Sequence, residues 1–185
     1  MRAPRLSPLQ AIRKVLGRDE LPAGFTGRLE PDERVLATAA LTDGGHVVVT
    51  SWGLWIPDVD GTRRVGWHLV SKAAWSSGPG SGGAIELIEA REEAAGGAVL
   101  LADLPPRRLR LAAAGRVPET VHERVTSSIR SRHHRDLPGG GAWFVQRKVA
   151  GRDGFVLQVR PDPGTDPAAV RALAADAART LGLSG

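Results

Sequence analysis

The chain has 185 residues, a net charge of +5 and a hydrophobic fraction of 42%, which is enough for a folded core. It contains no cysteine, which excludes disulfides, thiolate catalysis and cysteine-ligated metal sites. No apolar run reaches the roughly 18–20 residues of a membrane span, and residues 1–17 lack the apolar run of a signal peptide. We therefore expect a cytoplasmic protein without membrane insertion.

The first expected element is a short amphipathic helix capped by Ser7, with Pro8 in its first turn and Gly17 at its end. A connector containing proline and glycine, residues 21–31, leads from this helix into the strands. Residues 1–31 are accordingly predicted to be an N-terminal helix and connector.

Short β-type runs separated by turn residues fill residues 33–114. About six or seven strands over roughly 80 residues are typical of a sandwich or a small barrel. The strands are expected at Val35–Leu41, His46–Thr50, Leu54–Ile56, Arg63–Trp75, Ile85–Ile88, Val99–Leu101 and Leu109–Leu111.

A helix is expected from Pro118 to His134, because Val117, Val121, Val125 and Ile129 recur every four residues. This apolar stripe could close the open end of a barrel. The run Pro138–Gly141 is the best candidate for a boundary or hinge after the helix.

The last segment predicts a β-hairpin, in which Trp143–Val149 pairs with Phe155–Arg160, and a final helix capped by Asp166. The predicted fold class is α+β: a small antiparallel β-barrel or sandwich capped by a helix, with a C-terminal hairpin and helix. The predicted domains are residues 1–31, the barrel with its helix at 32–135, and the extension at 142–185.

Three stretches, Glu33–Leu36, Thr50–Trp55 and Val65–Trp75, resemble the pleckstrin-homology-like barrel domain and uncharacterised actinobacterial proteins of that layout. The resemblance implies a barrel that serves as a protein-binding or assembly module. Phosphoinositide-binding members carry basic residues around the first hairpin loop, whereas the loop Thr42–His46 is acidic. Phosphoinositide binding is therefore not carried over to this chain.

Two loops and a histidine pair match parts of known ligand-binding motifs, but the neighbouring residues do not complete those motifs. The run Gly78–Gly83 matches G-x-G-x-x-G, but a strand pattern follows it where a dinucleotide site needs a helix. Asp58–Gly61 resembles the start of a calcium loop, yet the sixth and twelfth positions hold Arg63 and Leu69. Neighbouring arginines repel a cation from His133 and its neighbour His134. We expect no cofactor, no metal ion and no catalytic residue.

Four tryptophans lie within 24 residues and could form either a barrel core or a patch for a partner. Trp67 and Trp75 share strand parity and are expected in the core, provided that the strand is unbroken. Trp52 and Trp55 have opposite parity, so one of them is expected to point outward.

The segment from Leu104 to Arg135 carries a net charge of +6. In an arginine-biased composition a solvated face is the simpler interpretation, and contact with an acidic partner is the functional one. The candidate partner-binding surface comprises Trp52, Trp55, Arg107, Arg108, Arg110, Arg124, Arg130, Arg132 and Arg135.

The leading hypothesis is a non-enzymatic scaffold that binds a protein partner or a second copy of itself. The first alternative is a nucleic-acid-associated protein that uses the basic face at 107–135. The second alternative is an enzyme whose active-site residues are dispersed along the chain.

Overall fold

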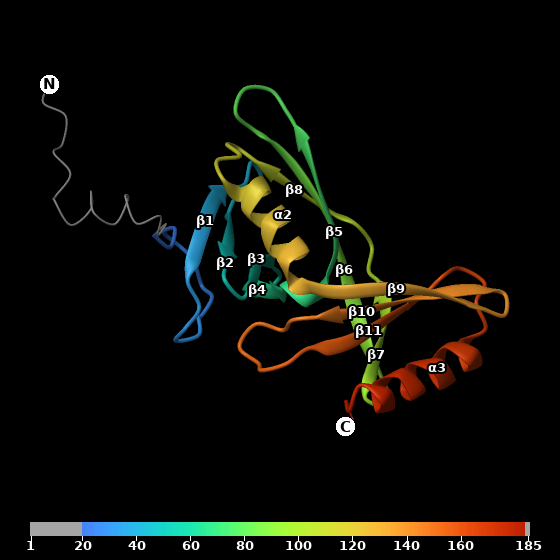
Figure 1. Cartoon of the computed structure of the whole chain (residues 1–185). Coiled ribbons are helices and arrows are strands. Elements are labelled where there is room, and N and C mark those ends of the chain that lie inside the picture. The colour runs from blue at the N-terminus through green and yellow to red at the C-terminus, as the bar shows by residue number, and fades with distance from the viewer. Residues whose placement is uncertain (1–19, 184–185) are drawn as a thin grey trace, which may run out of the picture.

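The computed structural model describes residues 20–183, and the expected N-terminal helix lies outside this range. The chain forms two strand-rich halves that share one long strand (Figure 1). The strands are β1 Val35–Ala40, β2 His46–Thr50, β3 Gly53–Asp58, β4 Gly61–Gly66, β5 Val70–Ser77, β6 Gly83–Ala95, β7 Ala98–Asp103, β8 Arg107–Leu111, β9 Ile129–Leu137, β10 Gly140–Arg147 and β11 Val156–Pro161, and the helices are α2 Val117–Ser128 and α3 Pro167–Thr180.

The N-terminal half contains β1–β5, β8, the first part of β6, and α2. Strands β1–β4 form an antiparallel sheet, while β6 pairs with β5 on one side and β8 on the other. A bridge between Leu41 and Leu111 joins the two sets of strands. Helix α2 buries Val117 and Val121 in the same core as Leu54 of β3. The burial of this helix face closes the core on one side.

The C-terminal half is a mixed sheet with the strand order β6-β7-β11-β10-β9. Strand β11 runs parallel to β7 and antiparallel to β10, and β9 is the outermost strand. Helix α3 packs on one face of this sheet, where Val170, Ala174 and Ala178 contact its apolar side chains. Its first turn is capped by Asp166, whose Oδ1 accepts a hydrogen bond of 3.0 Å from the N–H of Ala168.

The α+β class, the strands over residues 35–58, the hairpin β10–β11 and the capped final helix are confirmed. The runs 58–61 and 78–83 are connections between antiparallel strands, as expected. Strand β6 is longer than predicted, with 13 residues, and its second part pairs with β7 in the C-terminal half. Hydrogen-bonded sheet therefore continues from β6 to the terminal hairpin. No helix within residues 20–183 is long and apolar enough to span a membrane.

The predicted strand Arg63–Trp75 is wrong as a single element, because the 3-10 helix η1, Trp67–Leu69, separates β4 from β5. Side chains alternate between the two faces of a sheet only along an unbroken strand. Because the 3-10 helix interrupts the strand, Trp67 and Trp75 need not point to the same side. Trp67 is 4% exposed, and its Nε1 donates a hydrogen bond to the carbonyl of Thr50 at 3.1 Å. Trp75 is 38% exposed, so its assignment to the core was wrong.

The predicted helix to His134 is also wrong beyond Ser128, where the chain becomes strand β9. The hydroxyls of Ser127 and Ser128 donate to the carbonyls of Arg124 and Val125. These carbonyls lie in the last turn of α2, where backbone acceptors lack partners within the helix. After Ser128 the chain pairs with β10 as an antiparallel strand. This non-local pairing overrides the four-residue apolar repeat.

The two halves are joined by Arg147 of β10, which is buried. Its guanidinium donates to the carbonyl of Val70 at 3.1 Å, the carbonyl of Trp67 at 2.9 Å and the hydroxyl of Ser128. Burial, with a further contribution from Arg160, lowers the pKa of Arg147 to about 10. One charged side chain thus fixes η1, β5 and the end of α2 against the C-terminal sheet.

His68 lies at the same junction, where its carbonyl accepts a 2.9 Å hydrogen bond from Nε2 of Gln158. Burial lowers the pKa of His68, and the charges of Arg147 and Arg152 lower it further, while Glu92 acts in the opposite direction. The folded protein therefore favours the neutral imidazole at this position.

We predict that Arg147→Ala lowers the free energy of unfolding by about 3 kcal/mol, because it removes several buried hydrogen bonds at once. Urea unfolding measures this change. The control Arg91→Ala truncates an exposed arginine on β6 and should change stability by less than about 0.5 kcal/mol. Equal stabilities of the two variants would contradict the role given to Arg147.

We also predict that His68 makes the fold less stable as the pH falls from about 7.5 to about 5.5. In this window the unfolded chain, with an ordinary histidine pKa, binds more protons at this position than the folded protein. His68→Gln should therefore lose less stability than the wild type over the same pH range in urea unfolding. An identical pH dependence of both proteins would contradict the assignment.

Candidate functional site

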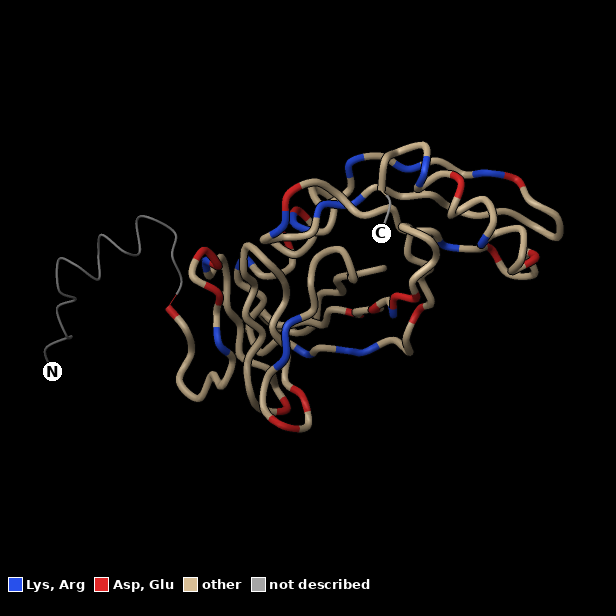
Figure 2. The backbone as a smooth tube through the Cα atoms, turned by 90° about the horizontal axis from the view of Figure 1, so that it is seen from below, with Lys and Arg blue, Asp and Glu red and all other residues tan. Residues whose placement is uncertain are grey.

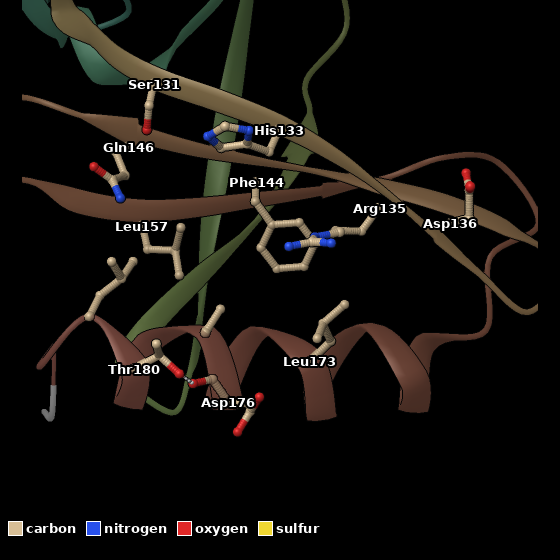
Figure 3. A pocket seen from close by; sticks show the side chains of 12 residues that line it. Ser131, His133, Arg135, Asp136, Phe144, Gln146, Leu157, Leu173, Asp176 and Thr180 are labelled. Atoms are coloured by element: carbon tan, nitrogen blue, oxygen red, sulfur yellow. Dashed lines mark hydrogen bonds between the residues drawn. The ribbon is translucent and has the colours of Figure 1, made fainter.

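A groove lies between helix α3 and the outer strands of the C-terminal sheet (Figure 3). It forms because α3 packs over β7 and β11, and its side chains do not cover the sheet as far as β9. The cavity has a volume of about 620 Å³. Its lining residues are Ser131, His133, Arg135, Asp136, Phe144, Gln146, Leu157, Leu173, Asp176, Ala177, Thr180 and Leu181.

The floor of this groove is apolar. Phe144 and Leu157 rise from the sheet, and Figure 3 shows both directed toward the helix. Leu173 and Ala177 come from α3, and the 40% exposed Leu181 directly follows its last residue. The apolar surface is therefore continuous between sheet and helix and partly open to solvent.

Polar and charged side chains line the rim. His133 and Arg135 extend from β9, and Asp176 and Thr180 lie on α3. No hydrogen bond or ion pair joins His133 to either aspartate of the groove, and Asp176 instead pairs with Arg179 at 3.1 Å. Within residues 20–183 no group of three histidine, aspartate or glutamate side chains is placed to hold a metal ion. The groove thus offers apolar contact with a polar rim, which are properties of a binding surface.

Strand β9 forms the open edge beside the groove. It pairs with β10 on one side, and no strand within residues 20–183 pairs with its other side. All nine of its residues are exposed or only partly buried. An unpaired edge of this length is a template for a further strand.

Two arginines of β9 pack on aromatic rings: Arg132, on the face turned away from the groove, and Arg130, at a bulge where the register with β10 shifts. The guanidinium of Arg130 lies 5.0 Å from the ring centre of Phe155, and that of Arg132 lies 5.5 Å from Trp143. His134 contacts the edge of Trp143 and pairs with Asp162 at 2.7 Å. Arg132 and His134 are thus held in place on the face of β9 turned away from the groove.

A smaller cavity of about 250 Å³ lies on the same face and is lined by Arg132, Trp143, Gln158 and Arg160 among others. The Oε1 atom of Gln158 is buried and accepts no hydrogen bond from the described residues. Arg160 donates to Ser71 and pairs with Asp103. Burial raises the pKa of Asp103, but the hydrogen bonds from Arg160 and Ser71 outweigh burial and leave the pKa below its ordinary value.

The two tryptophans of the predicted surface lie outside the groove. Trp55 is buried, and its Nε1 donates to Oε1 of Glu33 at 2.9 Å. Trp52 is half-buried, packs against Gly151 and lies 5.3 Å from the guanidinium of Arg64. Of this pair, the more exposed side chain is Trp52.

The predicted arginines are distributed over three elements, and Figure 2 shows basic residues in several separate parts of the chain. On β8, Arg107 donates to the carbonyl of Pro57, Arg108 stands opposite Glu86, and Arg110 lies 3.8 Å from Asp43. Arg124 is on α2 beside Glu123. Arg130, Arg132 and Arg135 share β9, so the predicted arginines are divided between two strands in different halves and one helix.

Sequence reasoning missed the groove and the buried carboxylate of Glu33. Glu33 accepts from Thr50 and Trp55 and pairs with Arg64, so all its contacts are within the N-terminal half. The residues of the groove floor come from β10, β11 and α3, which are distant in sequence. The available signal was the alternation of Trp143 and Phe144, which places one aromatic ring on each face of β10.

No protein-family model matches the chain, and comparison with curated proteins and with solved structures found no match. The function is therefore inferred from the geometry of the groove and of the strand edge.

Proposed function

We propose that this protein is a non-enzymatic, cytoplasmic scaffold whose C-terminal half binds a protein partner. The observation that carries the proposal is the open groove between α3 and β9–β10, with its apolar floor and polar rim. A groove of this kind accepts apolar side chains of a peptide or protein segment, while the rim selects the charge of the segment.

The exposed apolar surface supports a macromolecular occupant. Leu181 at the end of α3 and Trp143 on β10 are 40% and 38% exposed, and they lie on opposite faces of the C-terminal sheet. Partly exposed large side chains near an unpaired strand are typical of interaction surfaces. A partner bound at β9 could contact both faces of the sheet.

We assign the N-terminal half to the pleckstrin-homology-like class. Strands β1–β6 and β8 with the packed helix α2 support the assignment, because they provide seven strands and a helix around one core. In this proposal the N-terminal half is the rigid support, and binding is the task of the C-terminal half.

The groove is tested with Ala177→Trp, which places a large ring in the cavity, and Ala172→Trp, which places the same ring on the exposed side of α3. Leu181→Asp is a second groove variant, because it puts a charge on the apolar floor without enlarging a buried side chain. The immobilised proteins capture partners from the native lysate. We predict that both groove variants recover the partner at least about tenfold less well than the wild type and Ala172→Trp.

A wild-type protein that retains no partner would refute this function. So would groove variants that recover the same partner in full. Thermal unfolding of each variant shows that a loss of binding does not result from a loss of folding.

A second candidate function is binding of nucleic acid by the three arginines of β9, Arg130, Arg132 and Arg135. Arg130 and Arg132, packed on Phe155 and Trp143, favour it, because positioned guanidinium groups contact phosphates. The proposal needs no base-specific contact.

We predict for this candidate that RNA or DNA binding weakens steeply with salt and that replacing Arg130, Arg132 and Arg135 by glutamine reduces the salt dependence. The slope of log K against log salt should fall by about one unit for each arginine that no longer neutralises a phosphate. Replacing Arg108, Arg110 and Arg116, all exposed, removes the same charge elsewhere and is the control. Equal slopes for the two triple variants, or no binding at low salt, would exclude the candidate.

A further inference from the structure

From the unpaired edge of β9 we infer how the partner is held: an acidic, extended segment of the partner adds to the sheet as a further strand beside β9. The inference rests on the proposed function and specifies both the mode of binding and the chemistry of the partner. It depends on the backbone of β9, on the facing of its side chains and on its charge.

The backbone of β9 has free hydrogen-bonding groups at known positions. A two-residue turn, Pro138 and Gly139, joins β9 to β10, so Leu137 and Gly140 form the first hydrogen-bonded pair of the ladder. Bonded and non-bonded pairs alternate in an antiparallel ladder. The N–H and C=O groups of Arg132 and His134 are therefore directed away from β10, toward the open edge.

The side chains of β9 alternate between two useful surfaces. Ser131, His133 and Arg135 face the groove. Arg132 and His134 lie on the opposite face, against Trp143. Alternate side chains of an added strand would therefore contact the groove side and the arginine side in turn.

The charge of β9 selects the occupant. Its exposed side chains include three arginines and two histidines against a single aspartate, Asp136. Pairing with β9 of a second copy would place cationic side chains close together, which is unfavourable. Residues 1–19 of the chain carry five basic residues and one acidic residue, so their charge does not complement the edge either. A partner segment rich in aspartate and glutamate would complement the positive charge of β9.

The edge is also held in position before any partner arrives. Ser128, the last residue of α2, accepts hydrogen bonds from the buried Arg147 and so anchors the start of β9. At the other end, the N–H of Asp166 donates to the carbonyl of Pro138 at 3.1 Å and ties the turn to the start of α3. A strand that is ordered in advance lowers the entropic cost of binding.

The test uses a random dodecapeptide library displayed on phage, selected on the whole protein, and synthetic copies of the peptides recovered. We expect these peptides to be enriched in aspartate and glutamate alternating with apolar residues. Arg132→Pro removes an N–H at the open edge that β10 does not use, whereas Arg132→Gln removes only the charge. Arg132→Pro should bind the peptides at least about tenfold more weakly than Arg132→Gln.

A second measurement leaves the protein unchanged. Peptides whose backbone nitrogens are methylated at alternate positions keep their charges but lose donors to the edge. One of the two alternating patterns should lose at least about tenfold in affinity, and the other should lose less.

Recovered peptides without acidic residues, equal binding by Arg132→Pro and Arg132→Gln, or full affinity of both methylated peptides would each overturn the strand-addition mode. Failure to select any peptide would do the same. If a partner is nevertheless captured by the wild type and not by Ala177→Trp, the proposed function stands and only this mode is refuted. If no partner depends on the groove, the proposed function itself fails.

Discussion

The arrangement of the two halves depends on the buried guanidinium of Arg147. It is surrounded by neutral acceptors, the carbonyls of Trp67 and Val70 and the hydroxyl of Ser128, rather than by a carboxylate. A charge buried in this way costs free energy, which is reflected in its lowered pKa of about 10. The cost is offset by hydrogen bonds that an apolar side chain could not make. Arg147 thereby specifies one orientation of the halves.

The binding surface follows from this constraint. Arg147 contacts Ser128, where helix α2 ends and β9 begins, so the same interaction that joins the halves also fixes the first residues of the open edge. Strand β6, which runs through both halves, makes the support continuous. Helix α3 packs over the inner strands of the C-terminal sheet and leaves the groove beside β9. The groove and the open edge thus lie side by side because α3 covers only part of the C-terminal sheet.

Much of the fold could be predicted from local signals. Asp166 followed by Pro167 indicated the start of α3, and turn residues indicated the β10–β11 hairpin, because caps and turns depend on a few adjacent residues. The end of α2 could not be predicted, since the pairing of β9 with β10 decides it and the apolar repeat continues to Ile129. The role of Arg147 was equally hidden, because its acceptors lie on distant elements.

The candidate site was predicted only in part. Arg130, Arg132 and Arg135 were found from their charge and share one strand, whereas Arg107, Arg108 and Arg110 lie on β8 and Arg124 on α2. The groove could not be found, since its floor joins Phe144 and Leu157 of the sheet to α3. Residues that meet only in the folded chain leave no spacing that a single sequence can reveal.

Strand addition at β9 is measured by backbone amide hydrogen exchange, followed residue by residue along β9 with and without a bound acidic peptide. We predict that the peptide slows exchange at Arg132 and His134, whose amides face the open edge. Exchange at Ser131 and His133, which already bond to β10, should change much less. Unchanged exchange along β9, or new protection confined to the N-terminal half, would exclude binding of the partner at this edge.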